Sequence, residues 1–242
     1  MASTSETGHA KNVANFRELI AFSTAYGATY NPAKNALKVP QLIALKALAD
    51  TKLNNVINVN TIYNIAVNER MIAFSGLKAY ATRLVNALQT TDASTETINN
   101  AKAFNRKMQG KRASAAPTPV DTNTPAPNTI STSQQSFDQL IQHFAGIKAI
   151  LAAETSYSPN ETDLQVAAVQ AKIDELNAKN SAVATAYANI SNARIDRNQT
   201  LYHPETGIVA VAADVKKYIK SVFGASSPQF AQVKGLTFKS VA

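Results

Sequence analysis

Five cations lie close together in the segment AKAFNRKMQGKR, residues 101–112. They are Lys102, Arg106, Lys107, Lys111 and Arg112. Clusters of this kind neutralise the phosphates of nucleic acid or the charges of another polyanion. The same pattern is typical of a solvated helix end whose last turn carries cations that complement the helix dipole. Both interpretations stay open from the sequence.

Three arginines form a second candidate, a small anion pocket. Arg70 and Arg197 occupy matching places near the ends of two predicted long helices, and Arg194 precedes Arg197 on the same helix. A guanidinium can hold a carboxylate or phosphate through two parallel hydrogen bonds. A cation near a helix C-terminus also complements the dipole and pairs with neighbouring helices. We favour this structural interpretation over a ligand pocket.

The three histidines, His9, His143 and His203, lie in unrelated sequence contexts. None has a second histidine or a carboxylate at metal-ligand spacing on an inward helix face, so nothing supports a zinc or di-iron site. We expect His143 to lie on a helix flank. His203 belongs to LYHPETG, residues 201–207, an insertion without a counterpart earlier in the chain, for which we favour ordinary turn chemistry over a specialised site.

Motifs of the common enzyme classes are missing. The 242 residues contain no cysteine, which excludes a thiolate nucleophile and a Cys-ligated metal. Neither G-x-S-x-G nor a glycine-rich phosphate loop occurs. The sequence therefore predicts a non-enzymatic protein without cofactor or metal, and a small-ligand or catalytic helical bundle is the last of the alternatives.

Helices are the elements that must position these residues. Hydrophobic residues make up 45% of the chain and aromatic residues only 7%, which suits closely packed helices, so we predict an all-α fold. Apolar residues at alternating steps of three and four from Val166 to Arg197 predict one long helix, and Val39 to Arg70 predict another. Shorter helices are expected over 77–88, 137–153 and 208–223. In the helix at 39–70 the apolar stripe is wider, so we expect that helix to bury more than one face; the additional residues are Leu45, Leu48, Ile62 and Ile65.

The two halves of the chain resemble each other. Residues 30–70 match residues 157–197 at a constant offset of 127, which becomes 131 at Gly76 and Gly207 and 132 further on. Changes of offset that fall only between helices are typical of a duplication. Each half then contains four helices, which predicts a tandem duplication of an antiparallel four-helix-bundle-like domain.

A repeated segment precedes each long helix: TYNPAKNALKV, residues 29–39, and SYSPNETDLQV, residues 156–166. Ser158 and Glu161 have the spacing of a capping box. We interpret both segments as the corner between the first two helices of a half, and not as a doubled binding loop.

A proline-rich segment separates the halves. APTPVDTNTPAPNT, residues 116–129, holds four of the nine prolines and is expected to be extended. The predicted domains are a basic first bundle at 1–112, a Pro/Thr/Ala-rich linker at 113–130 and a second bundle at 131–242. The first carries 14 Lys and Arg against 6 Asp and Glu, and the last carries 10 against 9.

These patterns favour a structural or protein-interaction role. Tandem helical bundles with a long seam suit binding to a protein partner or to copies of the same chain, including self-assembly. The alternative is a nucleic-acid or polyanion-binding protein that uses the basic first half. No secretory signal and no run of about 18 apolar residues is present, so we expect a soluble protein, cytoplasmic in preference to extracellular.

Overall fold

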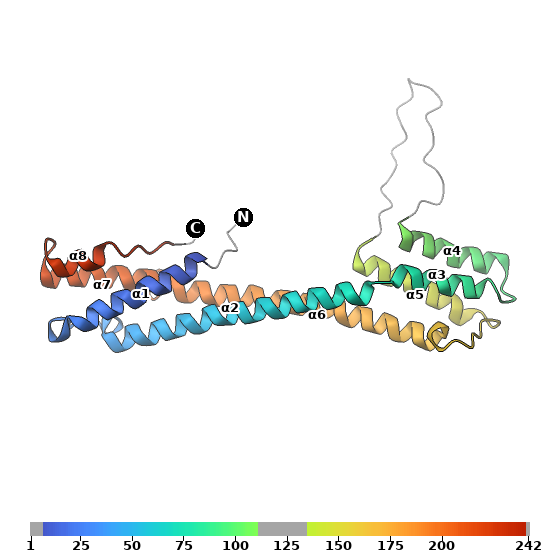
Figure 1. Cartoon of the computed structure of the whole chain (residues 1–242), viewed down its shortest axis with the longest axis horizontal. Helices are drawn as coiled ribbons and strands as arrows, with labels where there is room; N and C mark the ends of the chain where they lie inside the picture. Colours follow the sequence, from blue (N-terminus) through green and yellow to red (C-terminus); the bar gives the residue numbers. More distant parts are fainter. Residues whose placement is uncertain (1–6, 111–134, 241–242) are drawn as a thin grey trace, which may run out of the picture. The chain divides into compact units, whose positions relative to one another are not determined.

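A computed structural model describes residues 7–110 and 135–240 (Figure 1). The predicted linker, Lys111 and Arg112 lie outside these ranges. The described residues are helical and contain no strand, which confirms the predicted all-α class. The α-helices are α1 (Thr7–Ala25), α2 (Val39–Phe74), α3 (Leu77–Leu88), α4 (Thr95–Gln109), α5 (Phe137–Ala153), α6 (Val166–Tyr202), α7 (Ile208–Phe223) and α8 (Pro228–Lys234). Three short 3-10 helices are η1 (Gly27–Thr29), η2 (Asn35–Leu37) and η3 (Thr162–Leu164).

The chain divides into two compact units. Unit 1 comprises Met1–Tyr63 and Ala186–Ala242, and unit 2 comprises Asn64–Thr185. This division differs from the expected one at residues 113–130, because each unit takes helices from both sides of the proline-rich segment. The physical reason is the length of α2 and α6, each of which contributes residues to both units.

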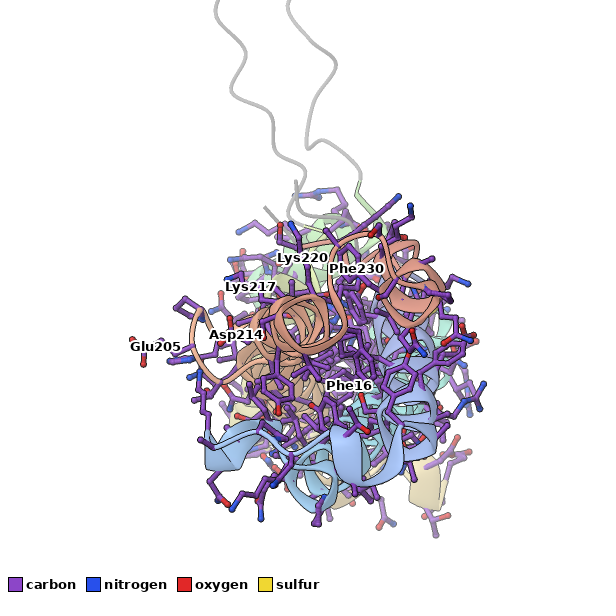
Figure 2. All side chains as sticks on the ribbon, turned by 90° about the vertical axis from the view of Figure 1, so that its left-hand side faces the viewer. Phe16, Glu205, Asp214, Lys217, Lys220 and Phe230 are labelled. Carbon is purple, nitrogen blue, oxygen red and sulfur yellow. The ribbon has the colours of Figure 1, made fainter. Side chains whose placement is uncertain are left out.

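The core of unit 1 forms between α1 and α7. Phe16 and Leu19 of α1 are fully buried and pack with aliphatic residues of the other helices. These are Leu42 and Ala49 of α2, Leu201 of α6, Ile208, Val215 and Ile219 of α7, and Val233 of α8. Figure 2 shows Phe16 in the interior of the side-chain mass, whereas Glu205 projects from its edge.

The core of unit 2 forms where α5 packs against α3 and α4. Phe144 and Ile147 of α5 are fully buried there. Their neighbours in the cluster include Leu84 and Leu88 of α3, Ala101 and Met108 of α4, and Leu176 of α6. Burial of these apolar side chains supplies the main stabilisation of the unit.

The long helices α2 and α6 contact each other through polar and aromatic side chains as well as through their apolar faces. In unit 1 the Lys52 ammonium lies 3.1 Å from Asp196, and the rings of Tyr63 and Tyr187 have centroids 6.1 Å apart. Residue numbers rise along α2 while they fall along α6, so the helices are antiparallel there. In unit 2 the Lys179 ammonium lies 2.8 Å from Glu69.

Among the described residues, α2 does not have the second buried face that we expected. Leu48, Ile62 and Ile65 are exposed by 47%, 56% and 52%. Leu45 alone of the four packs, partly buried, against the core of unit 1. The prediction was wrong for the single chain because the helices present cover only one side of α2.

A buried tyrosine closes the corner before each long helix. The Tyr30 hydroxyl donates to the Leu37 carbonyl at 2.7 Å, and the Tyr157 hydroxyl donates to the Leu164 carbonyl at 2.9 Å. Burial raises the pKa of each tyrosine to about 12. The capping box predicted at Ser158 and Glu161 does not cap a helix, since α6 begins only at Val166. The corner interpretation of both segments agrees with these contacts.

Glycine is required at two matching positions for different reasons. Gly76 has φ +77° at the start of α3, in the left-handed region that side chains disfavour. Gly207 has an extended backbone, but a Cβ there would lie 2.5 Å from the His203 amide nitrogen. The first position is fixed by backbone conformation and the second by close packing.

Candidate anion-binding site

The three arginines of the predicted pocket do not lie in one unit. Arg70 belongs to unit 2, whereas Arg194 and Arg197 belong to unit 1. The Arg70 guanidinium lies 4.2 Å from the centroid of the Phe137 ring, and its Nη1 donates to Asn180 Oδ1 at 3.1 Å. Cation–π and amide contacts of this kind hold a helix-end arginine against its neighbours. Arg70 thus fits the structural interpretation.

Arg197 is buried, with 4% of its surface exposed. Its Nε and Nη2 donate to Asn198 Oδ1 at 3.1 and 2.9 Å. Arg194 is half-buried, and its Nε has no hydrogen-bond partner among the described residues. No described residue accepts hydrogen bonds from both Arg194 and Arg197.

The described cations of the basic segment lie on α4. Arg106 and Lys107 are in its last turn, beside the carbonyls that the helix leaves unpaired, and Lys102 is one turn earlier. The Lys107 ammonium lies 5.6 Å from the centroid of the Phe104 ring. Lys102 and Arg106 instead line a hollow between α3 and α4.

This hollow, which we name the basic groove, has a volume of about 780 Å³. Its lining residues are Lys78, Ala79 and Thr82 of α3, and Lys102, Asn105, Arg106 and Gln109 of α4. Three of the seven are cations, and none of these described residues is acidic. Sequence reasoning missed Lys78 and Thr82, although their spacing of four residues places them on one face of a helix.

An amide network joins the two walls of the basic groove. Gln109 Nε2 donates to the Lys78 carbonyl at 3.0 Å and to Thr82 Oγ1 at 3.3 Å. Asn105 Nδ2 donates to Thr82 Oγ1 at 3.2 Å. These hydrogen bonds fix the spacing of α3 and α4, so the cations are held on a formed surface.

His143 was expected on a helix flank, and this prediction was wrong. The side chain is buried in the face of α5 that also carries Phe144, with 6% of its surface exposed. Its ring centroid lies 6.3 Å from that of Phe104, and its Nε2 has no partner among the described residues. Burial, with a smaller contribution from the Lys107 charge, lowers the pKa of His143 below its ordinary value of 6.5.

Stability is therefore expected to fall in mild acid through His143. The unfolded chain binds the imidazole proton more tightly than the folded chain, so protonation favours unfolding as the pH drops below 6.5. In urea titrations at about pH 7.5 and pH 5.5, wild type should lose more unfolding free energy than His143→Gln. Equal losses in the two proteins would contradict this expectation.

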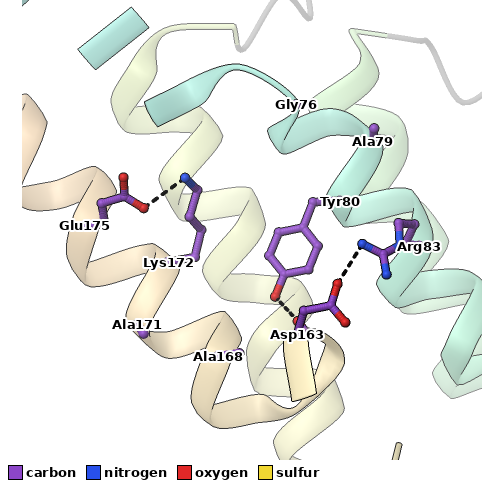
Figure 3. A pocket seen from close by; sticks show the side chains of 9 residues that line it. All are labelled: Gly76, Ala79, Tyr80, Arg83, Asp163, Ala168, Ala171, Lys172 and Glu175. Atoms are coloured by element: carbon purple, nitrogen blue, oxygen red, sulfur yellow. Dashed lines mark hydrogen bonds and ion pairs between the residues drawn. The ribbon is translucent and has the colours of Figure 1, made fainter. Parts of the chain in front are cut away.

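A second groove, with a volume of about 600 Å³, lies between α3, η3 and α6 in unit 2 (Figure 3). Arg83 Nη1 lies 2.8 Å from Asp163 Oδ2, and Lys172 Nζ lies 2.9 Å from Glu175 Oε2. The Tyr80 hydroxyl donates to the Asp163 carbonyl. All four charged side chains of this groove are thus paired with each other, which leaves no net charge for an ion.

Unit 1 has a groove of about 740 Å³ at the matching place, against α7 and the start of α2. Asp214 Oδ2 lies 2.9 Å from Lys34 Nζ, and Asp214 Oδ1 lies 3.3 Å from Lys217 Nζ. The hydrogen bond from Lys34 is the largest cause that lowers the pKa of Asp214. Figure 2 shows Asp214 and Lys217 on the same side as Glu205 of the insertion.

The insertion itself forms a turn. His203 Nδ1 accepts hydrogen bonds from the amide nitrogens of Glu205 and Thr206, each at 3.3 Å. This arrangement agrees with the turn interpretation of LYHPETG. The histidine ring is used to hold the loop.

Comparison of the chain with protein-family models, curated proteins and solved structures finds no match. Over residues 7–110 and 135–240, no group of three or more His, Asp or Glu side chains could hold a metal ion. In the same ranges no helix combines the length and apolar character needed to cross a bilayer. The contacts and surfaces of the described residues are therefore the basis for a functional proposal.

Proposed function

We propose that this chain is a non-enzymatic, self-associating helical protein, and that copies meet through one side of α2. The observation that carries this proposal is the distribution of exposed apolar side chains. Of the ten large hydrophobic residues exposed in the described part of the chain, seven lie on α2. They are Ile43, Leu48, Ile57, Ile62, Ile65, Met71 and Ile72, with 47–73% of their surface exposed.

The matching helix α6 shows what a solvated face looks like in this protein. At the offset of 127, the seven α2 residues correspond to Gln170, Glu175, Ala184, Asn189, Asn192, Asn198 and Gln199. Six of these are polar and the seventh is alanine. A helix face that meets only water is expected to be polar, so aliphatic residues concentrated on α2 favour a protein partner.

The spacing on α2 favours a second copy as that partner. Ile43, Ile57 and Met71 follow one another at intervals of fourteen residues, two heptads each. The row is symmetric about Ile57, so an antiparallel copy of α2 would place Ile57 against its own counterpart and Ile43 against Met71. A surface that complements itself in this way suits a two-fold dimer.

Substitution of this row by its α6 counterparts tests the proposal. In light scattering at rising concentration, wild type should exceed the 25.8 kDa mass of one chain, and I43Q/I57A/M71N should remain at that mass. Loss of three aliphatic contacts on each side is expected to weaken association at least about tenfold. The glutamine, alanine and asparagine introduced in this variant are all tolerated within a helix.

Ile195→Asn is the matched control. Ile195 is 62% exposed on α6, and Asn68 stands at the corresponding place on α2. The control should associate like wild type. Wild-type protein that stays at the mass of one chain at high concentration, or a triple variant that assembles normally, would refute self-association through α2.

We also propose that the fold arose by tandem duplication of an antiparallel four-helix-bundle-like domain, with helices of both copies present in each unit. Matching contacts support this proposal. The corner hydrogen bonds of Tyr30 and Tyr157 occur at the same offset of 127. The ion pairs Lys52–Asp196 and Lys179–Glu69, one in each unit, correspond at that offset as well.

A further pair of matching contacts has its charges reversed. At the offset of 131, Arg83 of α3 corresponds to Asp214 of α7. Arg83 pairs with Asp163 beside η3, and Asp214 pairs with Lys34 beside η2. In unit 2 the cation lies on the helix and the anion on the corner, whereas in unit 1 the anion lies on the helix and the cation on the corner. An ion pair between the corner and that helix is present in both units. Such compensation is what two diverged copies would retain.

A further inference from the structure

We propose that the basic groove binds the phosphate backbone of double-stranded nucleic acid. This function is independent of self-association, because the groove lies on α3 and α4 and none of its lining residues belongs to α2. Three features of the groove favour this ligand: its charge, the restriction of that charge to one half of the chain, and its hydrogen-bonding surface.

The groove holds cations without compensating charge. Lys102 and Arg106 form no ion pair with a described residue, and Lys78 Nζ donates to the neutral Gln135 Oε1 at 2.6 Å. The lysines that line the other two large grooves are paired instead, Lys172 with Glu175, and Lys34 and Lys217 with Asp214. Three uncompensated cations in one hollow favour a ligand that carries several negative charges.

The charge is particular to the first half of the chain. At the matching places in the second half, Val209 stands for Lys78 and Phe238 stands for Arg106. Only Lys102 has a cationic counterpart, Lys234. Cations that were needed only for helix packing would be expected in both halves, so their restriction to one half favours a binding role.

The remaining lining residues suit a sugar–phosphate backbone. Thr82, Asn105 and Gln109 present hydroxyl and amide groups, which commonly contact phosphate and sugar oxygens. None of the lining residues is aromatic, so the groove offers no platform on which the bases of a single strand could stack. Duplex nucleic acid presents closely spaced phosphates without exposing its bases, and it fits this surface best. Recognition of this kind is independent of base sequence.

Fluorescence anisotropy with the full chain and a short labelled DNA duplex of random sequence tests the proposal. Three phosphate contacts predict a slope of log affinity against log salt of about −2.7, or a roughly 40-fold loss of affinity from about 50 to about 200 mM salt. K78Q/K102Q/R106Q should bind at least about tenfold more weakly and bring the slope close to zero. K102Q alone should reduce it by about one.

A charge-matched control separates the groove from general basicity. Lys11, Arg17 and Lys38 are exposed in unit 1, and K11Q/R17Q/K38Q removes the same number of lysines and arginines. Wild-type-like affinity of this variant supports the groove. Equal loss in both triple variants, tighter binding of single-stranded than of duplex DNA, or no duplex binding at low salt would each overturn the proposal. The variant I43Q/I57A/M71N should keep duplex binding, so failure of self-association is distinguishable from failure of the groove.

Discussion

Replacing Phe144 by alanine is expected to lower the free energy of unfolding by about 3–5 kcal/mol. The ring is fully buried on α5, and its centroid lies 5.5 Å from that of Tyr80 on α3. Truncation removes the favourable transfer free energy of the ring. It also leaves a cavity, which the surrounding helices fill only in part. Chemical denaturation followed by far-ultraviolet circular dichroism measures the loss.

Two further phenylalanines make this prediction specific. Phe16 is fully buried in the core of unit 1, so Phe16→Ala should cost a similar amount. Phe230 of α8 is only half-buried, so Phe230→Ala should cost less than half as much. If Phe144→Ala cost less than about 1 kcal/mol, the ring would not be a central part of the core.

Helix bounds were predictable where local chemistry marks them. The helices expected over 77–88, 137–153 and 208–223 match α3, α5 and α7. A glycine next to the helix ends α7, and Ser136 caps the start of α5 by accepting from the Gln139 amide. Such capping signals involve only a few neighbouring residues, so the helix ends that they mark can be predicted from a single sequence.

The assignment of helices to units could not be predicted in the same way. In a chain with two similar halves, the apolar face of each long helix can be covered equally well by a helix of its own half or of the other half. Periodicity shows that Val169 and Leu176 face a partner, but not which helix supplies it. The proline-rich segment predicts a domain boundary, whereas the compact units depend on the long helices that lie on either side of it.

The candidate site was predictable in part. Lys102 and Arg106 stand out as a basic segment, but Lys78 is an isolated lysine that reaches the groove only because α3 packs against α4. The burial of His143, in contrast, follows from the sequence. The histidine lies three residues after Leu140 and four before Ile147, both buried, so helical periodicity places it on the apolar face.

Cleavage of the chain within residues 116–129 is expected to leave the two halves bound to each other. A recognition sequence for a site-specific protease, inserted there in the full chain, allows the cut to be made after folding. In unit 2, Leu84 and Leu88 come from before the cut and Phe144 and Ile147 from after it, and they share one core. Separation would expose that core to water, along with the matching core of unit 1.

Size-exclusion chromatography after cleavage measures the outcome. If helices of both halves build each unit, the fragments should elute together at the size of the uncut chain and separate only in denaturant. Sequential bundles at 1–112 and 131–242 would instead separate into two folded fragments with unchanged helical dichroism. Since no peptide bond then joins the halves, their persistence as one species would depend on shared cores and on ion pairs such as Lys52–Asp196 and Lys179–Glu69. Salt should have little effect on that persistence, because exposed ion pairs contribute less than about 1 kcal/mol each while apolar burial is not screened.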